Sequence, residues 1–214
     1  MINYFSILSH DIIALITIFN PIAAASIMVS MLPSTHANVV KPIVFKATST
    51  VIIASLITLY SGEFIFKLFG INVLSLKVIG GIILMLIAIN MAYGQMTKAR
   101  HTKEEEAEAE TKEDISIVPL AIPILFGPGA IATIIVLNHN LTKDYSTFIS
   151  YGLVTIAIFV SSIVIYFTLK YASAINKILG VTGMKVLTRI MGLIVGAIAA
   201  QFLVSGVKGL WGSM

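Results

Sequence analysis

The chain has 214 residues, of which 57% are hydrophobic and only 11% are charged, and its mean hydropathy is +0.98. Soluble domains carry roughly a quarter charged residues, so this composition excludes a soluble globular protein and predicts an integral membrane protein. The formal net charge of +4 is too small to indicate a nucleic-acid partner. The absence of cysteine excludes disulfides and thiol chemistry, and the four histidines match no metal-ligand spacing. We therefore expect no metal and no cofactor.

Six apolar segments can be traced in chain order, each long enough to cross a bilayer as a helix of about 20 residues. The first apolar run continues to Leu32 after a start without cationic residues, so we expect a membrane span rather than a cleaved signal peptide. Pro42 stands where the second span should begin, which is a favourable first helical position. The six expected spans are 11–32, 43–62, 71–95, 115–138, 146–169 and 187–208.

One polar stretch, MTKARHTKEEEAEAETKED at 96–114, divides the chain into two sets of three spans. Its dense charge predicts a solvated connector with no function beyond linking. We therefore expect residues 1–95 to form a first three-helix repeat, 96–114 a charged cytoplasmic loop and 115–214 a second three-helix repeat.

Two strings near the middle of the first and fourth expected spans align without gaps. Residues 19–29 read FNPIAAASIMV and residues 126–136, which lie 107 positions further along, read FGPGAIATIIV. Later matches follow in the same order, with an offset that reaches 111, as in Gly81 with Gly192. Because each half has an odd number of spans, the second half must enter the membrane from the opposite side, which predicts inverted-topology repeats. Chance alignment of short apolar strings is the alternative.

Lysine and arginine are distributed unevenly between the two sets of loops, with ten on one side and four on the other. Cationic loops stay in the cytoplasm, so we expect a multi-pass protein of the bacterial or archaeal cell membrane with both termini outside. The ten residues expected in the cytoplasm are Lys41, Lys46, Lys98, Arg100, Lys103, Lys112, Lys170, Lys177, Lys185 and Arg189.

Both matched strings contain residues that interrupt a helix. Pro21 and Pro128 have no N–H, so each is expected to leave a carbonyl unpaired, that of Thr17 in one half and that of Ile124 in the other. Irregular backbone at membrane depth is tolerated only inside protein or beside a wet cavity. The breaks therefore predict a site, although a proline or glycine in a membrane helix can also produce a simple bend.

Asn20 and Gly127 precede these prolines and suit the N-cap of a new half-helix, and Gly129 loosens the second break further. The second half-helices would begin near the midplane with positive dipole ends that favour a carboxylate. The first half-helices would end there with carbonyls that suit an ammonium or a cation, so a zwitterion fits both. Small side chains such as Ala23 predict a small solute or, alternatively, close helix packing. The expected substrate-binding residues are Thr17, Asn20, Pro21, Ala23, Ile124, Gly127, Pro128 and Gly129.

The remaining polar residues of the spans are less informative. Asn90 and Gln201 occupy equivalent places in the third and sixth spans, where they could line the solute path or hydrogen-bond neighbouring helices. Asp11 and Glu63 lie at the outer ends of the first two spans, where we expect them at the membrane interface. No carboxylate stands in the middle of an expected span, so a proton relay has no obvious carrier, and a coupling ion, proton or sodium, is left open.

The segments FNPIAAAS and PLAIPILFGPGAIATII resemble the two hallmark segments of the MarC family of inner-membrane proteins, which includes SnatA-type small neutral amino acid transporters. The resemblance covers nearly the whole chain and implies a transporter with glycine and alanine as solutes. The matching positions are Asn20, Pro21, Gly127, Pro128 and Gly129. Many family members carry glycine where this chain has Ala23, which implies a less flexible first break or a smaller pocket.

We therefore predict an all-α integral membrane protein with two inverted three-helix repeats and the first and fourth spans broken at the midplane. Its predicted function is secondary transport of a small neutral amino acid by alternating access. Two alternatives are a passive channel or efflux pathway for a small neutral solute and a non-transporting membrane scaffold. No GxSxG, HExxH, paired intramembrane aspartates or phosphate loop occurs, so we do not expect an enzyme. The expected partners are the solute and membrane lipid, and the oligomeric state is left open.

Overall fold

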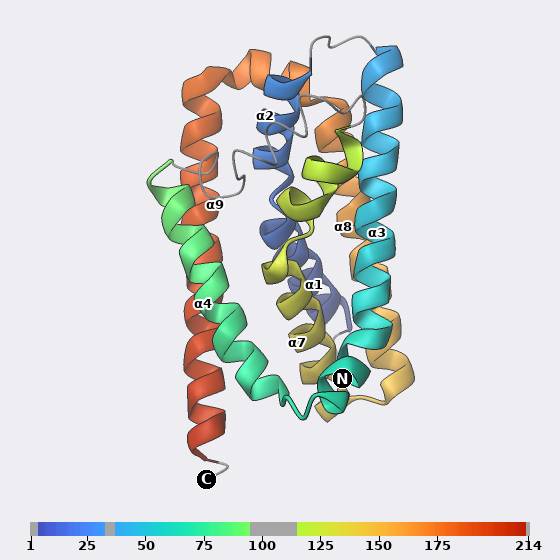
Figure 1. Ribbon diagram of the computed structural model, residues 1–214, viewed down its shortest axis with the longest axis vertical. Coiled ribbons are helices and arrows are strands. Elements are labelled where there is room, and N and C mark those ends of the chain that lie inside the picture. The colour runs from blue at the N-terminus through green and yellow to red at the C-terminus, as the bar shows by residue number, and fades with distance from the viewer. Residues whose placement is uncertain (1–3, 33–36, 95–114, 213–214) are drawn as a thin grey trace.

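The computed structural model describes residues 4–32, 37–94 and 115–212, which form an elongated bundle of helices without strands (Figure 1). The charged connector expected at 96–114 lies outside the described residues. Within the described part, five helices are long and apolar enough to cross a membrane, or six if one bent pair counts as a span. The all-helical membrane fold is thus confirmed.

The first span is made of two helices, α1 (Tyr4–Phe19) and α2 (Pro21–Met31). Asn20 between them has a φ of 47°, which is the left-handed region, and its side chain accepts a hydrogen bond from the N–H of Ala23. The expected N-cap at Asn20, with proline at the first position of the new helix, is confirmed. The helix begins at Tyr4 and not near residue 11, because the polar residues of its first two turns lie on an exposed face.

Helix α3 (Ala37–Leu68) and helix α4 (Val73–Ala92) complete the first half. Pro42 lies inside α3, so the expectation that it opens the span is wrong. Residues 37–41, which read ANVVK, already belong to the helix, and a proline in the second turn removes only one hydrogen bond near the end of a helix. The α4 helix begins after Asn72, whose side chain accepts from the N–H of Ser75 at 2.7 Å.

The second half begins with an irregular helical segment, η1 (Ser116–Leu125), which bends by 55° into helix α7 (Pro128–Asp144). Val118 and Ile122 have extended backbone dihedrals inside this segment. Each precedes a proline, and a residue before proline is pushed out of the helical region. The three prolines of the expected span 115–138 therefore divide it into short turns followed by one regular helix.

The chain ends with α8 (Thr147–Lys170) and the long helix α9 (Ala172–Trp211). The helix α9 is broken at Gly180, which has a φ of 62° and a ψ of 178°. Its first part lies across the upper end of the bundle and its second part descends beside α4 (Figure 1). The sequence pattern predicted the descending span at 187–208 but not the crosswise segment before it.

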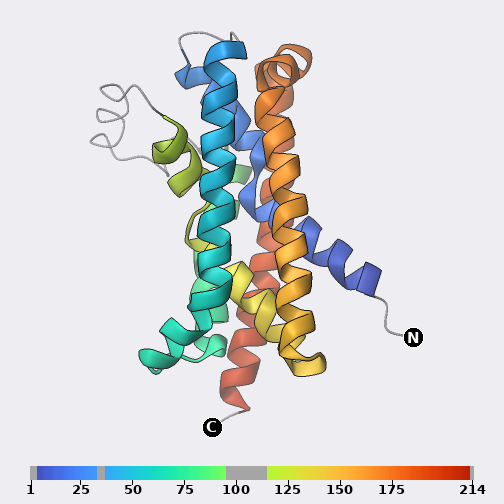
Figure 2. The same cartoon turned by 90° about the vertical axis from the view of Figure 1, so that its right-hand side faces the viewer.

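The helices pack as neighbours that are distant in sequence. Helices α3 and α8 stand side by side (Figure 2), where the Tyr60 and Tyr151 rings stack with centroids 5.4 Å apart. Both chain ends lie toward the lower end of the bundle (Figure 2). The outward faces carry exposed apolar side chains such as Ile82, Leu86 and Leu193, as expected of surfaces that meet lipid.

The most extensive packing joins α4 with α9. Glycines allow the two backbones to approach closely, as is common between membrane helices. A Cβ atom built on Gly81 would lie 3.0 Å from the Ala199 carbonyl oxygen, and one built on Gly192 would lie 3.1 Å from the Ala88 carbonyl oxygen. Neither position accepts a larger side chain without separating the helices.

Candidate functional site

Two cavities and a small gap lie along the axis of the bundle. The lower cavity has a volume of about 450 Å³, the upper cavity about 300 Å³, and the central gap about 10 Å³. A cavity needs roughly 10–15 Å³ to hold one water molecule, so the central gap has no room for a solute. The structure thus holds two open cavities and one gap that is closed to a solute.

The order of the three spaces is the same along three helices. From α1 into α2, Thr17 lines the lower cavity, Asn20 the central gap and Ala23 the upper cavity. Helix α4 repeats this order with Lys77, Leu84 and Gly94, where Gly94 directly follows the helix end. Along α9, which runs the other way, Thr188 lines the upper cavity, Val195 the gap and Ser205 the lower cavity. The central gap therefore lies between the two cavities.

The first break forms one wall of the central gap. The N–H of Asn20 donates to the Ile16 carbonyl at 3.0 Å and the N–H of Ala24 donates to the Asn20 carbonyl at 3.2 Å. The side-chain amide of Asn20 is 2% exposed and its nitrogen donates to the Met91 sulfur of α4 at 3.5 Å. Asn20 therefore holds the start of α2 and also ties the break to α4.

The second break forms the opposite wall. The N–H of Phe126 reaches the Ala121 carbonyl at 2.8 Å, five residues back, and the N–H of Ala130 starts the new helix with a 2.9 Å bond to the Gly127 carbonyl. Gly129 faces α4 so closely that a Cβ atom there would lie 2.5 Å from the Leu84 Cδ2. This contact seals the gap from the side of α4.

Of the eight expected substrate-binding residues, four line the central gap, namely Asn20, Ile124, Gly127 and Gly129. Thr17 lines the lower cavity and Ala23 the upper one. Pro21 is buried but lines none of these spaces, and Pro128 is exposed on the outside of the bundle. The structure thus brings the two breaks together, while the prolines themselves face away from the gap.

The two residues expected on a solute path are separated. Gln201 lines the lower cavity, whereas Asn90 is half-buried and lines none of the three spaces. Their equivalent places in the sequence therefore do not correspond to equivalent surroundings in this conformation.

Sequence reasoning missed three polar residues near the lower cavity. Lys77 falls inside the expected span 71–95 and is one of the four cations counted on the outer side, but it is buried in α4 with 7% of its surface exposed, and its ammonium donates to the Asn140 side chain at 2.9 Å. The expectation of an interfacial Asp11 is corrected, because its side chain is buried between helices, 3% exposed, and one carboxylate oxygen lies 3.1 Å from the His10 ring. Both burials depend on helices far away in sequence, so no local pattern could have indicated them.

The equivalent strings of the two halves line different cavities. Thr133 and Val136 line the lower cavity, and Ser26 and Val29, which stand 107 positions earlier, line the upper one. Similarly, Ser205 lines the lower cavity, and Gly94, which stands 111 positions earlier, lines the upper one. The two cavities are therefore built from matching positions of the two halves.

Comparison with known proteins agrees with the resemblance noted in the two broken segments. The chain matches the family of MarC family integral membrane proteins over residues 5–211. It is 33% identical over 198 residues to a "UPF0056 membrane protein" of Aquifex aeolicus, covering 92% of this chain and 91% of the relative. It is 34% identical over 200 residues to the "UPF0056 membrane protein YhcE" of Escherichia coli, covering 93% and 91%, and 34% identical over 208 residues to the "UPF0056 membrane protein YvbG" of Bacillus subtilis, covering 97% of each. No solved structure matches the chain. The chain belongs to the MarC family of integral membrane proteins.

Proposed function

We propose that the protein is a secondary transporter of small neutral amino acids that exposes a central site alternately to the two sides of the membrane. The observation that carries this proposal is the pair of cavities on either side of a closed gap lined by both helix breaks. A channel needs a continuous path, whereas a transporter needs two half-paths that never open together. Small side chains at the gap, such as Ala130 and Gly129, favour a solute of the size of glycine or alanine.

Two inverted repeats would explain how one site serves both sides, and the packing of α4 against α9 supports them. A Cβ atom on Gly81 would lie 3.0 Å from the Leu203 nitrogen, and one on Gly192 would lie 3.1 Å from the Ala92 nitrogen. Leu203 stands 111 positions after Ala92, the same offset as that between the two glycines. Reciprocal contacts of this kind are the signature of a two-fold axis between equivalent helices.

In this proposal the breaks lie near the membrane midplane and bind the zwitterion. The N–H groups at the starts of α2 and α7 would receive the carboxylate, since helix N-termini favour anions. The carbonyl ends of α1 and η1 would receive the ammonium group. Rocking of one repeat against the other would widen the gap toward one cavity while closing it toward the other.

The cationic residues support a sidedness for this cycle. Among the described residues, the upper end carries the cations of the α3 start, the α8 end and the α9 start, including Lys41, Lys170 and Lys177. The upper end would therefore face the cytoplasm and both termini the outside. Because the chain has no cysteine, single cysteines introduced at each end, followed by labelling with an impermeant thiol reagent in intact cells, would test the orientation directly.

The test of the function is uptake of labelled glycine and alanine by proteoliposomes, with and without imposed proton and sodium gradients. Accumulation above equilibrium under one gradient would establish a secondary transporter and name its coupling ion. Equilibration alone would favour the passive channel, and absence of uptake by folded protein would reject the substrate class. A Gly129→Ala variant should lose uptake because its Cβ would meet Leu84 at 2.5 Å, whereas Gly152→Ala should keep it, since no atom lies within 4 Å of that position.

A further inference from the structure

Lys77 places a positive charge inside the bundle, and within the part of the chain that the structure describes it has no counter-ion. Its ammonium makes one hydrogen bond, with the neutral side chain of Asn140 at 2.9 Å. Among the described residues, no acidic side chain is recorded as an ion-pair partner of Lys77. An ammonium has three donors, so two of those on Lys77 are left for a further acceptor. Charged groups inside membrane proteins are costly and usually mark the route of an ion or a solute.

A lysine near a helix end can also extend its side chain to the membrane surface instead of into the protein. Such a lysine would expose its ammonium at the lipid interface. Lys77 is only 7% exposed, lines the lower cavity and bonds to Asn140 of α7, the helix that packs against α4 and also lines that cavity. The side chain therefore points inward, and its charge acts on the cavity.

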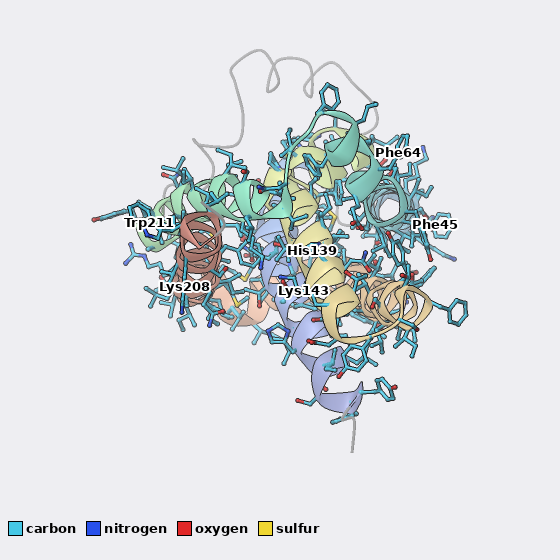
Figure 3. All side chains as sticks on the ribbon, turned by 90° about the horizontal axis from the view of Figure 1, so that it is seen from below. Phe45, Phe64, His139, Lys143, Lys208 and Trp211 are labelled. Atoms are coloured by element: carbon cyan, nitrogen blue, oxygen red, sulfur yellow. The ribbon has the colours of Figure 1, made fainter. Side chains whose placement is uncertain are left out.

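The lining of the lower cavity is suited to an anion at this wall. Its polar members include Thr133, Gln201 and Ser205, and the lining contains no carboxylate. At the lower end of the bundle, Lys143 is close enough to Lys77 for charge repulsion between the two ammonium groups. Seen from below (Figure 3), Lys143 and His139 of α7 lie over the middle of the bundle, whereas Lys208 lies toward the α9 side. The lower end of α7 thus adds a second positive charge, that of Lys143, near Lys77, and positive charge raises the local concentration of anions.

An acidic side chain lies behind the wall of the cavity that α1 forms. His10 lines the cavity from α1, and Asp11 behind it has one carboxylate oxygen on the His10 ring at 3.1 Å. The other oxygen of Asp11 is buried without a hydrogen-bond partner. A molecule with a carboxylate at one end and an ammonium at the other would find its two charges balanced across this space.

We propose that the lower cavity is a second binding site, in which Lys77 binds the carboxylate of the solute before it reaches the central gap. The carboxylate takes the two free donors of the ammonium, and the amino group faces the His10 and Asp11 wall. The identity of the solute as an amino acid rests on the proposed transport function, whereas recognition of a carboxylate rests on Lys77 alone.

Calorimetry on the purified full chain in nanodiscs tests the site with three probes: glycine, acetate and glycinamide. The wild type should bind glycine and acetate but not glycinamide, which lacks the carboxylate. Lys77→Met should weaken carboxylate binding about 10- to 100-fold, as expected for a lost hydrogen bond to a charged group. Lys41→Met, which removes an exposed cation at the start of α3, at the other end of the bundle, should change affinity by less than about 3-fold. Acetate binding as tightly as glycine would identify a general carboxylate site, and tighter binding of glycine would identify a zwitterion site.

Two further variants keep the test decisive. Lys77→Arg should retain binding, and Asn140→Ala should retain or strengthen it, because the ammonium loses its competing partner. Unchanged affinity in Lys77→Met, equal binding of glycinamide, or no carboxylate binding by the wild type would overturn the proposal. Gly129→Ala separates the two claims, since it should abolish uptake but keep Lys77-dependent binding. If the wild type binds carboxylates and transports none, the transport function fails and the site stands.

Discussion

The close approach of α4 to α9 predicts that single methyl groups at matching positions destabilise the protein. A Cβ atom on Gly192 would lie 2.7 Å from the Met91 Cβ, and one on Gly81 would lie 2.8 Å from the Leu203 Cγ. Carbon atoms prefer separations of about 3.5–4.0 Å, so each alanine requires a displacement of roughly 1 Å. Overpacking of this kind costs about 1–3 kcal/mol.

The matched control isolates this cost. Replacing any helical glycine with alanine gains about 1 kcal/mol of helix propensity, and Gly152→Ala gains only that, because no atom lies within 4 Å of its Cβ position. The difference between each interface variant and Gly152→Ala is therefore the overpacking cost. At about 2–4 °C for each kcal/mol, Gly81→Ala and Gly192→Ala should both melt well below the control.

Thermal unfolding in detergent, followed by circular dichroism, provides the measurement. The two interface variants should fall by similar amounts, since the two backbone contacts of Gly81, with the Ala199 oxygen and the Leu203 nitrogen, match those of Gly192 with the Ala88 oxygen and the Ala92 nitrogen. A melting temperature of either variant equal to that of Gly152→Ala would refute the argument for that contact. A large fall in one and none in the other would also remove the support that these contacts give to the inverted repeats.

Three further predictions concern the first break, the turn in α9 and the contact between α8 and α1. Asn20→Gly should be more stable than Asn20→Ala by about 1 kcal/mol in thermal unfolding, because glycine tolerates the φ of 47° and alanine does not, and equal melting would contradict the left-handed conformation. Gly180→Ala should lose about 1–3 kcal/mol although nothing crowds it, since its φ of 62° with ψ of 178° is almost exclusive to glycine, and an unchanged melting temperature would count against that backbone. Ser161→Ala removes a 3.3 Å bond to the Ile12 carbonyl that joins α8 to α1, and should cost no more than about 1 kcal/mol in the same assay.

The breaks could be predicted from the sequence because their causes are local. An asparagine before a proline supplies both a cap and a first helical residue, so the start of α2 follows from two adjacent positions. Val118 and Ile122 are extended for a similar reason, since each precedes a proline. The approach of the two breaks to one gap could be inferred only through the repeat, which relates positions 107 residues apart.

The remaining features depend on packing between distant segments and could not be predicted. The burial of Lys77 results from the helix that carries Asn140, which is 63 residues away. Asp11 is buried on α1, and no local sequence pattern predicts that α1 packs against α8. The crosswise part of α9 was not predicted for another reason. Residues 172–179 mix apolar residues with Lys177, and this composition is equally typical of a loop.

The central gap also determines what the resting protein does to the membrane around it. Protons cross proteins along unbroken files of hydrogen-bonded water, and a space of about 10 Å³ between walls such as Leu84 and Val195 interrupts any such file. The surrounding Ile18, Ile124 and Leu125 are apolar, and the Asn20 amide, which also lines the gap, is not an ionisable group that could carry a proton across the interruption. A cell could therefore hold many copies of the protein in this conformation without a proton leak that dissipates its membrane potential. The apolar closure between the two cavities acts as electrical insulation as well as a barrier to solute.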